Sequence, residues 1–204
     1  MEPNAERPII LVVHAVFRFD TNSPYAYLAA SRLESVLGHD VEWRPIAFAF
    51  LFRAQDRTPW SLTPSSRATG IAECEARARA RGLDLLRWPP GWPINSYSLE
   101  PLRAITAAIA HQRERELAMT LFRRNFASGE GLRSGDTIRA CWAEIGLDPQ
   151  TYEAEIEAAK PDLTEATSRA IAGGVPGVPT VTIADVHFWG DDRLEDAARF
   201  ALGA

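Results

Sequence analysis

The sequence predicts an α/β fold in which a split β-α-β … β-β-α core carries a large inserted all-helical domain. Strand-like segments occur only before residue 47 and again after residue 179, whereas the stretch between them has helical periodicity broken by proline and glycine. An insertion explains this order better than two domains in series. We therefore assign residues 8–61 and 174–204 to a discontinuous core and residues 62–173 to an inserted helical domain.

The first half of the core is predicted from one apolar run and one pair of helix signals. The run begins after Pro8, and Ser23 followed by Pro24 suits the N-cap and first position of a helix that Gly38 ends. A short helix between two strands favours a right-handed parallel crossover. The expected elements are a buried strand over Ile9–His14, a helix over 24–37, a strand over 41–46 and an irregular stretch over 47–61.

Similar capping and breaking residues predict the elements of the insertion and of the end of the chain. In the insertion we expect helices over 64–81, 99–127, 135–145, 148–160 and 162–172, and after it strands over 180–184 and 186–188 and a last helix over 192–202. Asp185 between the last two strands predicts a tight turn. The alternating Arg77, Arg79 and Arg81, with acidic residues interspersed, predict a solvated helix face.

Composition excludes several classes of function. The 204 residues are 46% hydrophobic and carry a net charge of −5, which is ordinary for a soluble globular protein and argues against a nucleic-acid partner. No apolar run approaches the roughly 20 residues of a membrane span, and the polar N-terminal residues do not resemble a signal peptide. We therefore expect a cytoplasmic protein without a membrane partner.

The cysteines and histidines give no sign of a redox or metal site. Cys74 and Cys141 form no C-x-x-C motif, and both are expected to be reduced, partly buried thiols. The four histidines are scattered without ligand spacing, so no metal is expected.

Ser23 is the strongest candidate for chemistry. It follows the first strand of an α/β fold and begins a helix, a position that favours a bound anion. A hydrogen bond to a charged group contributes roughly 1.5–3 kcal/mol, enough to bring a thiol with a pKa of about 8.5 near neutrality. No G-x-S-x-G elbow surrounds Ser23, so a nucleophilic role is not expected. Alternatively, Ser-Pro is simply a routine helix start.

A second candidate lies at the far end of the chain, in Gly177-Val178-Pro179-Thr180. A cis Val178–Pro179 bond would turn the backbone of Val178 outward to pair with an extended peptide, although Val-Pro also suits an ordinary strand entry. Together with Ser23, this segment looks like the active-site frame of a thioredoxin-like fold with serine in place of the redox cysteine. The first candidate ligand is then a thiol, glutathione above all.

Several motifs together resemble a known family. They are the stretch from Phe19 to Leu28 (FDTNSPYAYL), Pro93–Ser96 followed by Arg103, the Gly-Val-Pro-Thr segment, and FWGDDRL over 188–194. These are similar to the 2-hydroxychromene-2-carboxylate isomerases, relatives of kappa-class glutathione transferases within the DsbA-like group. The resemblance implies a thioredoxin-like core with a helical insertion, a homodimer, glutathione as cofactor and a small aromatic substrate, in the catabolism of aromatic compounds. In that reaction the glutathione thiolate adds reversibly to the ring-opened substrate, which rotates before the thiol leaves.

The resemblance also assigns roles to residues. Ser23 would stabilise the thiolate, Val178 beside a cis Pro179 would hold glutathione by its backbone, and Asp191 and Asp192 would meet the γ-glutamyl amine. The aspartates also suit plain N-capping of the last helix. The substrate pocket is expected to include Tyr25, Trp92 and Asn95, although Trp92 would serve equally as a core anchor.

The sequence departs from the family pattern over residues 55–67. The usual Gly-Asn-x-Pro-Pro element is replaced by Gln-Asp-Arg-Thr-Pro-Trp, and a lysine near the next helix is absent. Arg57 or Arg67 would supply the charge, and we expect Arg57 to contact the cofactor. Three hypotheses follow: a glutathione-dependent isomerase or kappa-like transferase, a non-catalytic thioredoxin-like binding module, and a disulfide oxidoreductase. The last is disfavoured because Ser23 and Ala26 occupy both cysteine positions of the redox motif.

Overall fold

The computed structural model describes residues 14–38 and 41–203. Its sheet has four strands in the order β2-β1-β3-β4, where β1 is Ala15–Phe19, β2 Glu42–Pro45, β3 Thr180–Ile183 and β4 Val186–Trp189. β1 pairs with β2 in parallel, and β1–β3 and β3–β4 pair antiparallel. The predicted β-α-β … β-β-α core and its parallel crossover are confirmed. The turn expected at Asp185 is also present, with Ala184 and Asp185 both at positive φ.

The strand that leads to Ser23 differs from the expectation. Residues 9–13 of the predicted strand lie outside the described residues, and β1 begins only after His14. Its residues alternate between buried and half-buried, with Phe17 and Phe19 inward. An apolar run does not predict this strand, because the charged Arg18 interrupts it. In the structure its guanidinium donates a 2.6 Å hydrogen bond to Oγ1 of Thr182 on β3.

The single helix predicted over 24–37 is divided in two: α1 is Pro24–Ala30 and α2 is Leu33–Leu37. The Ser31 hydroxyl donates to the carbonyl oxygen of Tyr27 at 2.8 Å, a back-bond that competes with the helix ladder and bends the chain. Ser23 is the N-cap of α1, as expected.

The expectation of an irregular stretch over 47–61 is wrong, because Phe48–Ala54 forms helix α3. Ala47 provides no side-chain cap. Instead, the Phe48 amide donates to the Asp20 carboxylate at 3.2 Å, and the Ala47 amide donates to the Thr167 hydroxyl at 3.1 Å. Both acceptors are distant in sequence, so a local pattern cannot reveal this helix start.

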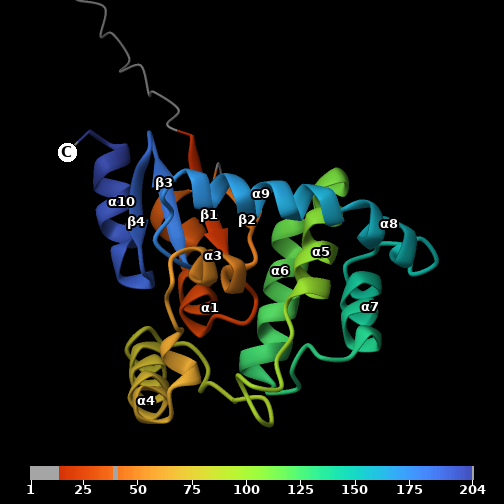
Figure 1. Cartoon of the computed structure of the whole chain (residues 1–204), viewed down its shortest axis with the longest axis horizontal. Coiled ribbons are helices and arrows are strands. Elements are labelled where there is room, and N and C mark those ends of the chain that lie inside the picture. Colours follow the sequence, from red (N-terminus) through yellow and green to blue (C-terminus); the bar gives the residue numbers. More distant parts are fainter. Residues whose placement is uncertain (1–13, 39–40, 204) are drawn as a thin grey trace, which may run out of the picture.

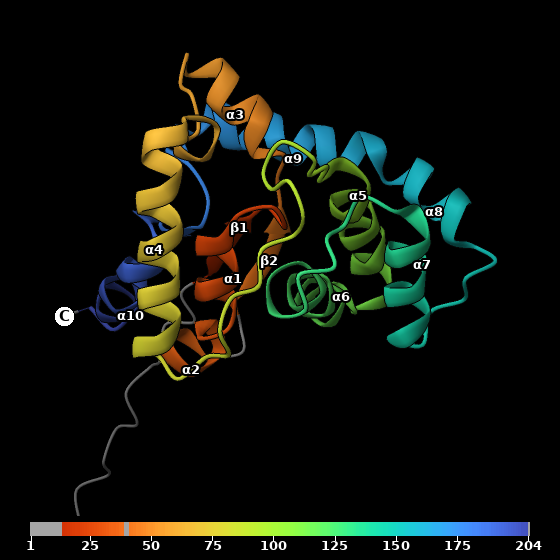
Figure 2. The same ribbon diagram turned by 90° about the horizontal axis from the view of Figure 1, so that it is seen from below.

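The inserted segment is helical, and α5–α8 gather beside the sheet while α4 lies apart from them (Figures 1 and 2). Helix α1 packs against both α4 and α6. The predicted helix over 99–127 is interrupted near Gln112, which has a φ of 58°, and the helix predicted from 148 begins only at Tyr152. The elements are η1 (Trp60–Leu62), α4 (Pro64–Ala80), α5 (Leu99–Ala108), η2 (Ile109–His111), α6 (Glu114–Phe122), η3 (Arg123–Ala127, a π-helical turn), α7 (Gly135–Glu144), α8 (Tyr152–Ala158) and α9 (Lys160–Ala172).

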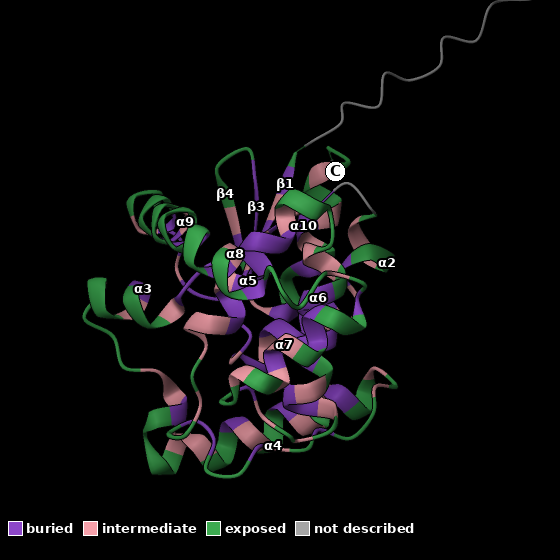
Figure 3. Cartoon of the chain, turned by 90° about the vertical axis from the view of Figure 1, so that its right-hand side faces the viewer, coloured by how far each residue is buried: buried purple, intermediate pink, exposed green. Residues whose placement is uncertain are grey.

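One continuous apolar core joins the sheet to the insertion. The rings of Phe19 and Trp43 lie 5.5 Å apart, and Phe19 also packs 5.8 Å from Phe122 of α6. Figure 3 shows the buried residues concentrated through β3, α5 and α6, with exposed outer faces on α3 and α9. The chain ends with η4 (Asp191–Arg193) and α10 (Leu194–Ala201), which packs on β3 and β4. No helix among the described residues is long and apolar enough to cross a membrane.

Candidate active site

A cavity of about 260 Å³ brings together residues from both ends of the chain and from the insertion. Of the residues predicted from the sequence, those that line it are Ser23, Tyr25, Trp92, Val178, Pro179, Asp191 and Asp192. Residues 23 and 178 are 155 positions apart, so their meeting depends on the fold. The cavity therefore combines most of the predicted site in one place.

Ser23 is held with its hydroxyl oxygen turned to the helix. Its Oγ accepts a 3.2 Å hydrogen bond from the Ala26 amide, and its own amide donates to the Asp20 carbonyl oxygen at 3.0 Å. Within residues 14–38 and 41–203, no acceptor takes the hydrogen of this hydroxyl. Ser23 is only 9% exposed. It is thus an N-cap that keeps a donor available to a ligand in the cavity.

Val178 offers a free backbone. The Val178–Pro179 peptide bond is cis, as predicted. Neighbouring groups are paired: the Thr180 hydroxyl donates to the Gly177 carbonyl oxygen at 2.7 Å, and the Gly190 amide donates to the Pro179 carbonyl oxygen at 2.9 Å. In the described part of the chain, the N–H and C=O of Val178 itself have no hydrogen-bond partner. Buried backbone groups are normally hydrogen-bonded, so the N–H and C=O of Val178 are suited to bind a ligand.

Aromatic rings form the walls of the cavity. Trp60 lies 5.7 Å from Trp92 and 5.8 Å from Tyr25 between ring centroids. Gly70 makes this possible, because a Cβ there would lie 2.3 Å from the Trp60 ring. Gly177 has the same role for Trp189, whose Nε1 would lie 2.6 Å from a Cβ. The tryptophans at 60 and 189 were not predicted to line the pocket, although Trp60 ends the Gln-Asp-Arg-Thr-Pro-Trp stretch and Trp189 lies in the FWGDDRL motif.

Tyr25 is held as a neutral phenol. Its hydroxyl donates to Oε2 of Glu73 at 2.9 Å, and the ring packs on Trp60. Burial, together with the neighbouring Cys74 and Glu73, raises the pKa of Tyr25 well above its ordinary value. Tyr25 is therefore a wall of the cavity rather than a base.

The two aspartates differ from each other. Asp191 is fully buried, and its carboxylate accepts hydrogen bonds from Arg77 (2.6 Å) and from Arg81. Its oxygens are thus already used to join α4 to η4. The side chain of Asp192 is 55% exposed and lies 3.4 Å from Arg77. Of the pair, Asp192 is the carboxylate available to a ligand, and Arg77 and Arg81 are not the solvated face that the alternating pattern predicts.

Two predicted residues lie outside the cavity. Asn95 is exposed, and its side chain covers Gly91, where a Cβ would lie 2.3 Å from its Nδ2. Arg57 stacks its guanidinium on the rings of Phe52 (4.6 Å) and Trp189 (4.9 Å) and donates to the Pro176 carbonyl oxygen at 2.6 Å. Both rings line the cavity, so Arg57 packs against the wall of the cavity without lining it.

Asp20 and Asn22 organise the loop before Ser23, and the motif analysis did not single them out. The Asp20 carboxylate is fully buried and accepts from the amides of Asn22 (2.8 Å) and Phe48 and from the Ser98 hydroxyl (3.1 Å). Burial raises the pKa of Asp20 to about 6 against the opposing effect of these hydrogen bonds. The Trp92 Nε1 donates to Oδ1 of Asn22 at 2.9 Å, and the Asn22 NH₂ group at the cavity has no acceptor among the described residues.

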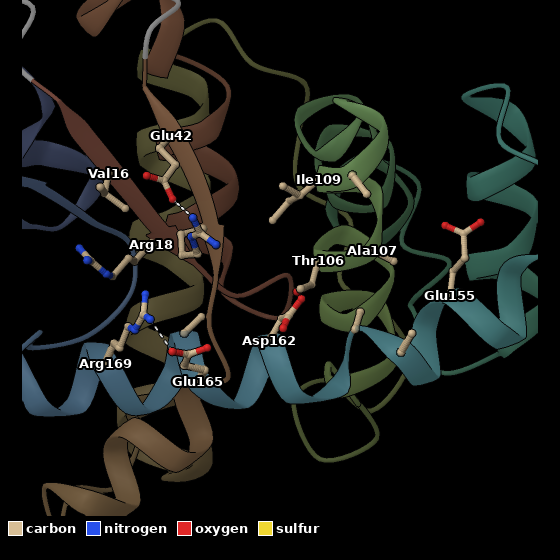
Figure 4. Close-up of a pocket in the computed structure, with 15 residues that line it drawn as sticks. Val16, Arg18, Glu42, Thr106, Ala107, Ile109, Glu155, Asp162, Glu165 and Arg169 are labelled. Atoms are coloured by element: carbon tan, nitrogen blue, oxygen red, sulfur yellow. Dashed lines mark hydrogen bonds and ion pairs between the residues drawn. The ribbon is translucent and has the colours of Figure 1, made fainter.

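A larger cavity, of about 710 Å³, is lined by Val16 and Arg18 of β1 (Figure 4). Two of its arginines are paired with carboxylates, Arg44 with Glu42 and Arg169 with Glu165. It contains no pairing of a nucleophile with a base. The Ser23 cavity is therefore the better candidate for chemistry.

The comparisons with known proteins agree with the thioredoxin-like fold that places Ser23 and Val178 at one cavity. Residues 15–200 match the DsbA-like thioredoxin domain. The chain belongs to the DsbA-like thioredoxin family. Its relatives include the 2-hydroxychromene-2-carboxylate isomerase of Sphingobium xenophagum, 26% identical over 91% of this chain and 96% of the relative. The isomerase of the same name from Pseudomonas sp. (strain C18) is 28% identical over 90% and 88% of the two chains. A solved 2-hydroxychromene-2-carboxylate isomerase structure shares the fold, with a TM-score of 0.79, 24% identity and coverage of 93% and 94%.

This DsbA-like protein has Ser23 and Ala26 at the two positions where a disulfide oxidoreductase of the thioredoxin fold has cysteines. Its free cysteines are both fully buried. Burial raises the pKa of Cys74 to about 12 and that of Cys141 to about 11. Both therefore remain protonated near neutral pH, which disfavours a thiol–disulfide exchange role.

Proposed function

We propose that this protein is a glutathione-dependent isomerase of the 2-hydroxychromene-2-carboxylate isomerase type, acting on a small aromatic or unsaturated substrate. The observation that carries the proposal is the Ser23 hydroxyl, which accepts from the Ala26 amide and keeps its own hydrogen for a ligand in an aromatic cavity. The names of the two curated relatives support the reaction class.

Three groups of the cavity suit a short peptide thiol. Ser23 provides a hydroxyl donor for the sulfur, Val178 provides an unpaired backbone N–H and C=O for the cysteinyl residue, and Asp192 provides a carboxylate for an amine. These groups are different in kind, and each matches a different part of glutathione. We assign the amine to Asp192 rather than Asp191, because Arg77 and Arg81 already occupy the Asp191 carboxylate.

Glutathione would supply a thiolate that adds reversibly to a carbon–carbon double bond of the substrate. That bond is then single and can rotate, and loss of the thiolate restores the double bond in the other geometry. Ser23 would stabilise that thiolate by a charge-assisted hydrogen bond. Because Ser23 is almost fully buried, solvent does not screen this bond strongly. A contribution of roughly 1.5–3 kcal/mol corresponds to a fall of about one to two units in the pKa of the thiol.

The aromatic walls would bind the substrate. Trp60, Trp92 and Trp189 present ring surfaces to the cavity, which suits a flat, unsaturated molecule. The free NH₂ group of Asn22 is placed to donate to a substrate oxygen.

Two measurements test the proposal. Calorimetric titration with glutathione is expected to show binding, and interconversion of 2-hydroxychromene-2-carboxylate with its ring-opened isomer is expected only when glutathione is added. S-methylglutathione is the matched control, because it keeps the peptide and blocks the thiol, and it should bind without supporting the reaction. Absence of heat at millimolar glutathione would instead favour a non-catalytic binding module.

A further inference from the structure

A third cavity lies between α3, α5 and α9, on the other side of α3 from Ser23. Figure 2 shows α3 and α5 alongside α9, and both helices pack against it. The cavity measures about 670 Å³. Phe48 and Phe52 of α3 line the Ser23 cavity, whereas Phe50 and Arg53 line this one. The two cavities are therefore separate.

The walls of this cavity are apolar. Leu163 is buried, Leu99 and Ile171 are half-buried, and Phe50 is 50% exposed. Large apolar side chains left exposed around a hollow indicate a place where apolar surface can be covered. The walls alone do not select an occupant.

The charged side chains around the cavity indicate which kind of ligand it binds. The ionisable side chains that line the cavity are Arg53, Arg103 and Lys160, and no carboxylate of the described residues lines it. The side chains of Arg53 and Arg103 have no hydrogen bond, ion pair or ring contact anywhere in residues 14–38 and 41–203. Among the described residues, the Lys160 ammonium has a single ion-pair contact, 3.5 Å from Oε1 of Glu157. By contrast, the arginines of the cavity in Figure 4 have partners, including Glu42 for Arg44 and Glu165 for Arg169.

We infer that this cavity binds an apolar carboxylate, a ligand with an uncharged hydrocarbon body and one anionic end. A guanidinium offers a fork of donors that matches a carboxylate, while the leucines, Ile171 and Phe50 cover the hydrocarbon. A neutral apolar molecule would leave the arginines without a role, and a highly charged anion would leave the apolar walls uncovered. The inference is independent of the function proposed for the Ser23 cavity.

Calorimetry on the full chain tests the inference with two probes of different shape, octanoate and 1-naphthoate. Their neutral counterparts, octan-1-ol and 1-naphthamide, measure the apolar part alone. The test variant is Arg53→Gln/Arg103→Gln. The matched control is Arg79→Gln/Arg133→Gln, which removes two exposed arginines elsewhere. Thermal unfolding of both variants verifies that they are folded, and sedimentation records their oligomeric state.

We expect at least one carboxylate to bind the wild type and the control variant equally. Its affinity for the test variant should fall by about tenfold or more, as for the loss of a charge-assisted hydrogen bond, with little change for the neutral counterpart. The probe that binds better identifies an aliphatic or an aromatic body. Equal affinity in the test variant, or no binding of either carboxylate at millimolar concentration, would overturn the inference. A change of oligomeric state in the test variant without carboxylate binding would also overturn it and assign the surface to a second copy of the chain.

Discussion

Asp20 shows how one buried carboxyl group positions the site. It accepts hydrogen bonds from the loop before Ser23, from the start of α3 and from Ser98 beside α5. These contacts fix three segments around one cavity wall. The cost is burial of an ionisable group, which raises the pKa of Asp20 to about 6.

This raised pKa predicts a pH-dependent stability. The unfolded chain ionises Asp20 near its ordinary pKa of 3.8, whereas the folded chain holds the proton until about pH 6. The folded state therefore binds more protons between these values, and stability falls as the pH rises through this window. The loss is about 3 kcal/mol.

Urea unfolding of the wild type and Asp20→Asn at several pH values measures this effect. The wild-type free energy of unfolding minus that of the variant should decrease from pH 4 to pH 6.5. Asp196→Asn is a useful control, because Arg199 and Arg193 lower the pKa of Asp196, so its effect on stability changes below its ordinary pKa of 3.8 and should be nearly constant from pH 4 to pH 6.5. A difference that stays constant with pH for Asp20→Asn would contradict the account.

Helix α4 depends on an ion pair more than on apolar packing. Its buried residues are the small Gly70, Cys74 and Ala78. Arg77 and Arg81 at its end bind the fully buried Asp191 of η4. The Trp60 wall packs on Gly70, so the position of α4 also sets the cavity.

Asp191→Asn and Asp192→Asn should therefore have different effects. Removing the Asp191 charge leaves the two arginines without their buried partner and should cost about 3 kcal/mol of stability, whereas the half-exposed Asp192 should cost about 0.5 kcal/mol or less. Asp192→Asn should instead weaken glutathione binding. Urea unfolding and calorimetry on the same two variants measure both effects, and equal destabilisation by the two would count against this assignment.

The sequence is least informative about helices and ion pairs whose partners are distant along the chain. Ser23, Pro24, Val178 and Pro179 could be recognised because their roles depend on local chain chemistry. Helix α3 and the Asp191 ion pairs could not, because their partners lie 28 residues away for Phe48 and 110 residues away for Arg81. Asn95 was placed in the pocket from its position in a motif, and the close packing of its side chain on Gly91 directs it elsewhere.

At the scale of the whole molecule, the cavity is assembled from the ends of the chain and closed by the insertion. β1 and β3 bring Ser23 and Val178 together, and the insertion contributes Trp92, whose indole holds Asn22. The division of the chain at residues 62 and 173, and the expected homodimer, remain predictions. The site requires the entire fold to be formed.

The same packing predicts that both cysteines are inert in the folded protein. Cys74 and Cys141 are fully buried, and their pKa values are raised to about 12 and about 11. Ellman's reagent at pH 8 should label neither thiol in the native protein and both in denaturant, since access requires opening of the core. Rapid labelling of two thiols in the native protein would contradict this packing.

The central claim is that the Ser23 hydroxyl stabilises a bound thiolate, and the pKa of glutathione bound to wild type and to Ser23→Ala tests it most directly. Ultraviolet thiolate absorbance as a function of pH gives both values, with Ser31→Ala as a control that removes a helix hydroxyl outside the cavity. We expect Ser23→Ala to raise the pKa of the bound thiol by about one unit or more and Ser31→Ala to leave it unchanged. An equal pKa in wild type and Ser23→Ala, with glutathione bound to both, would contradict the account.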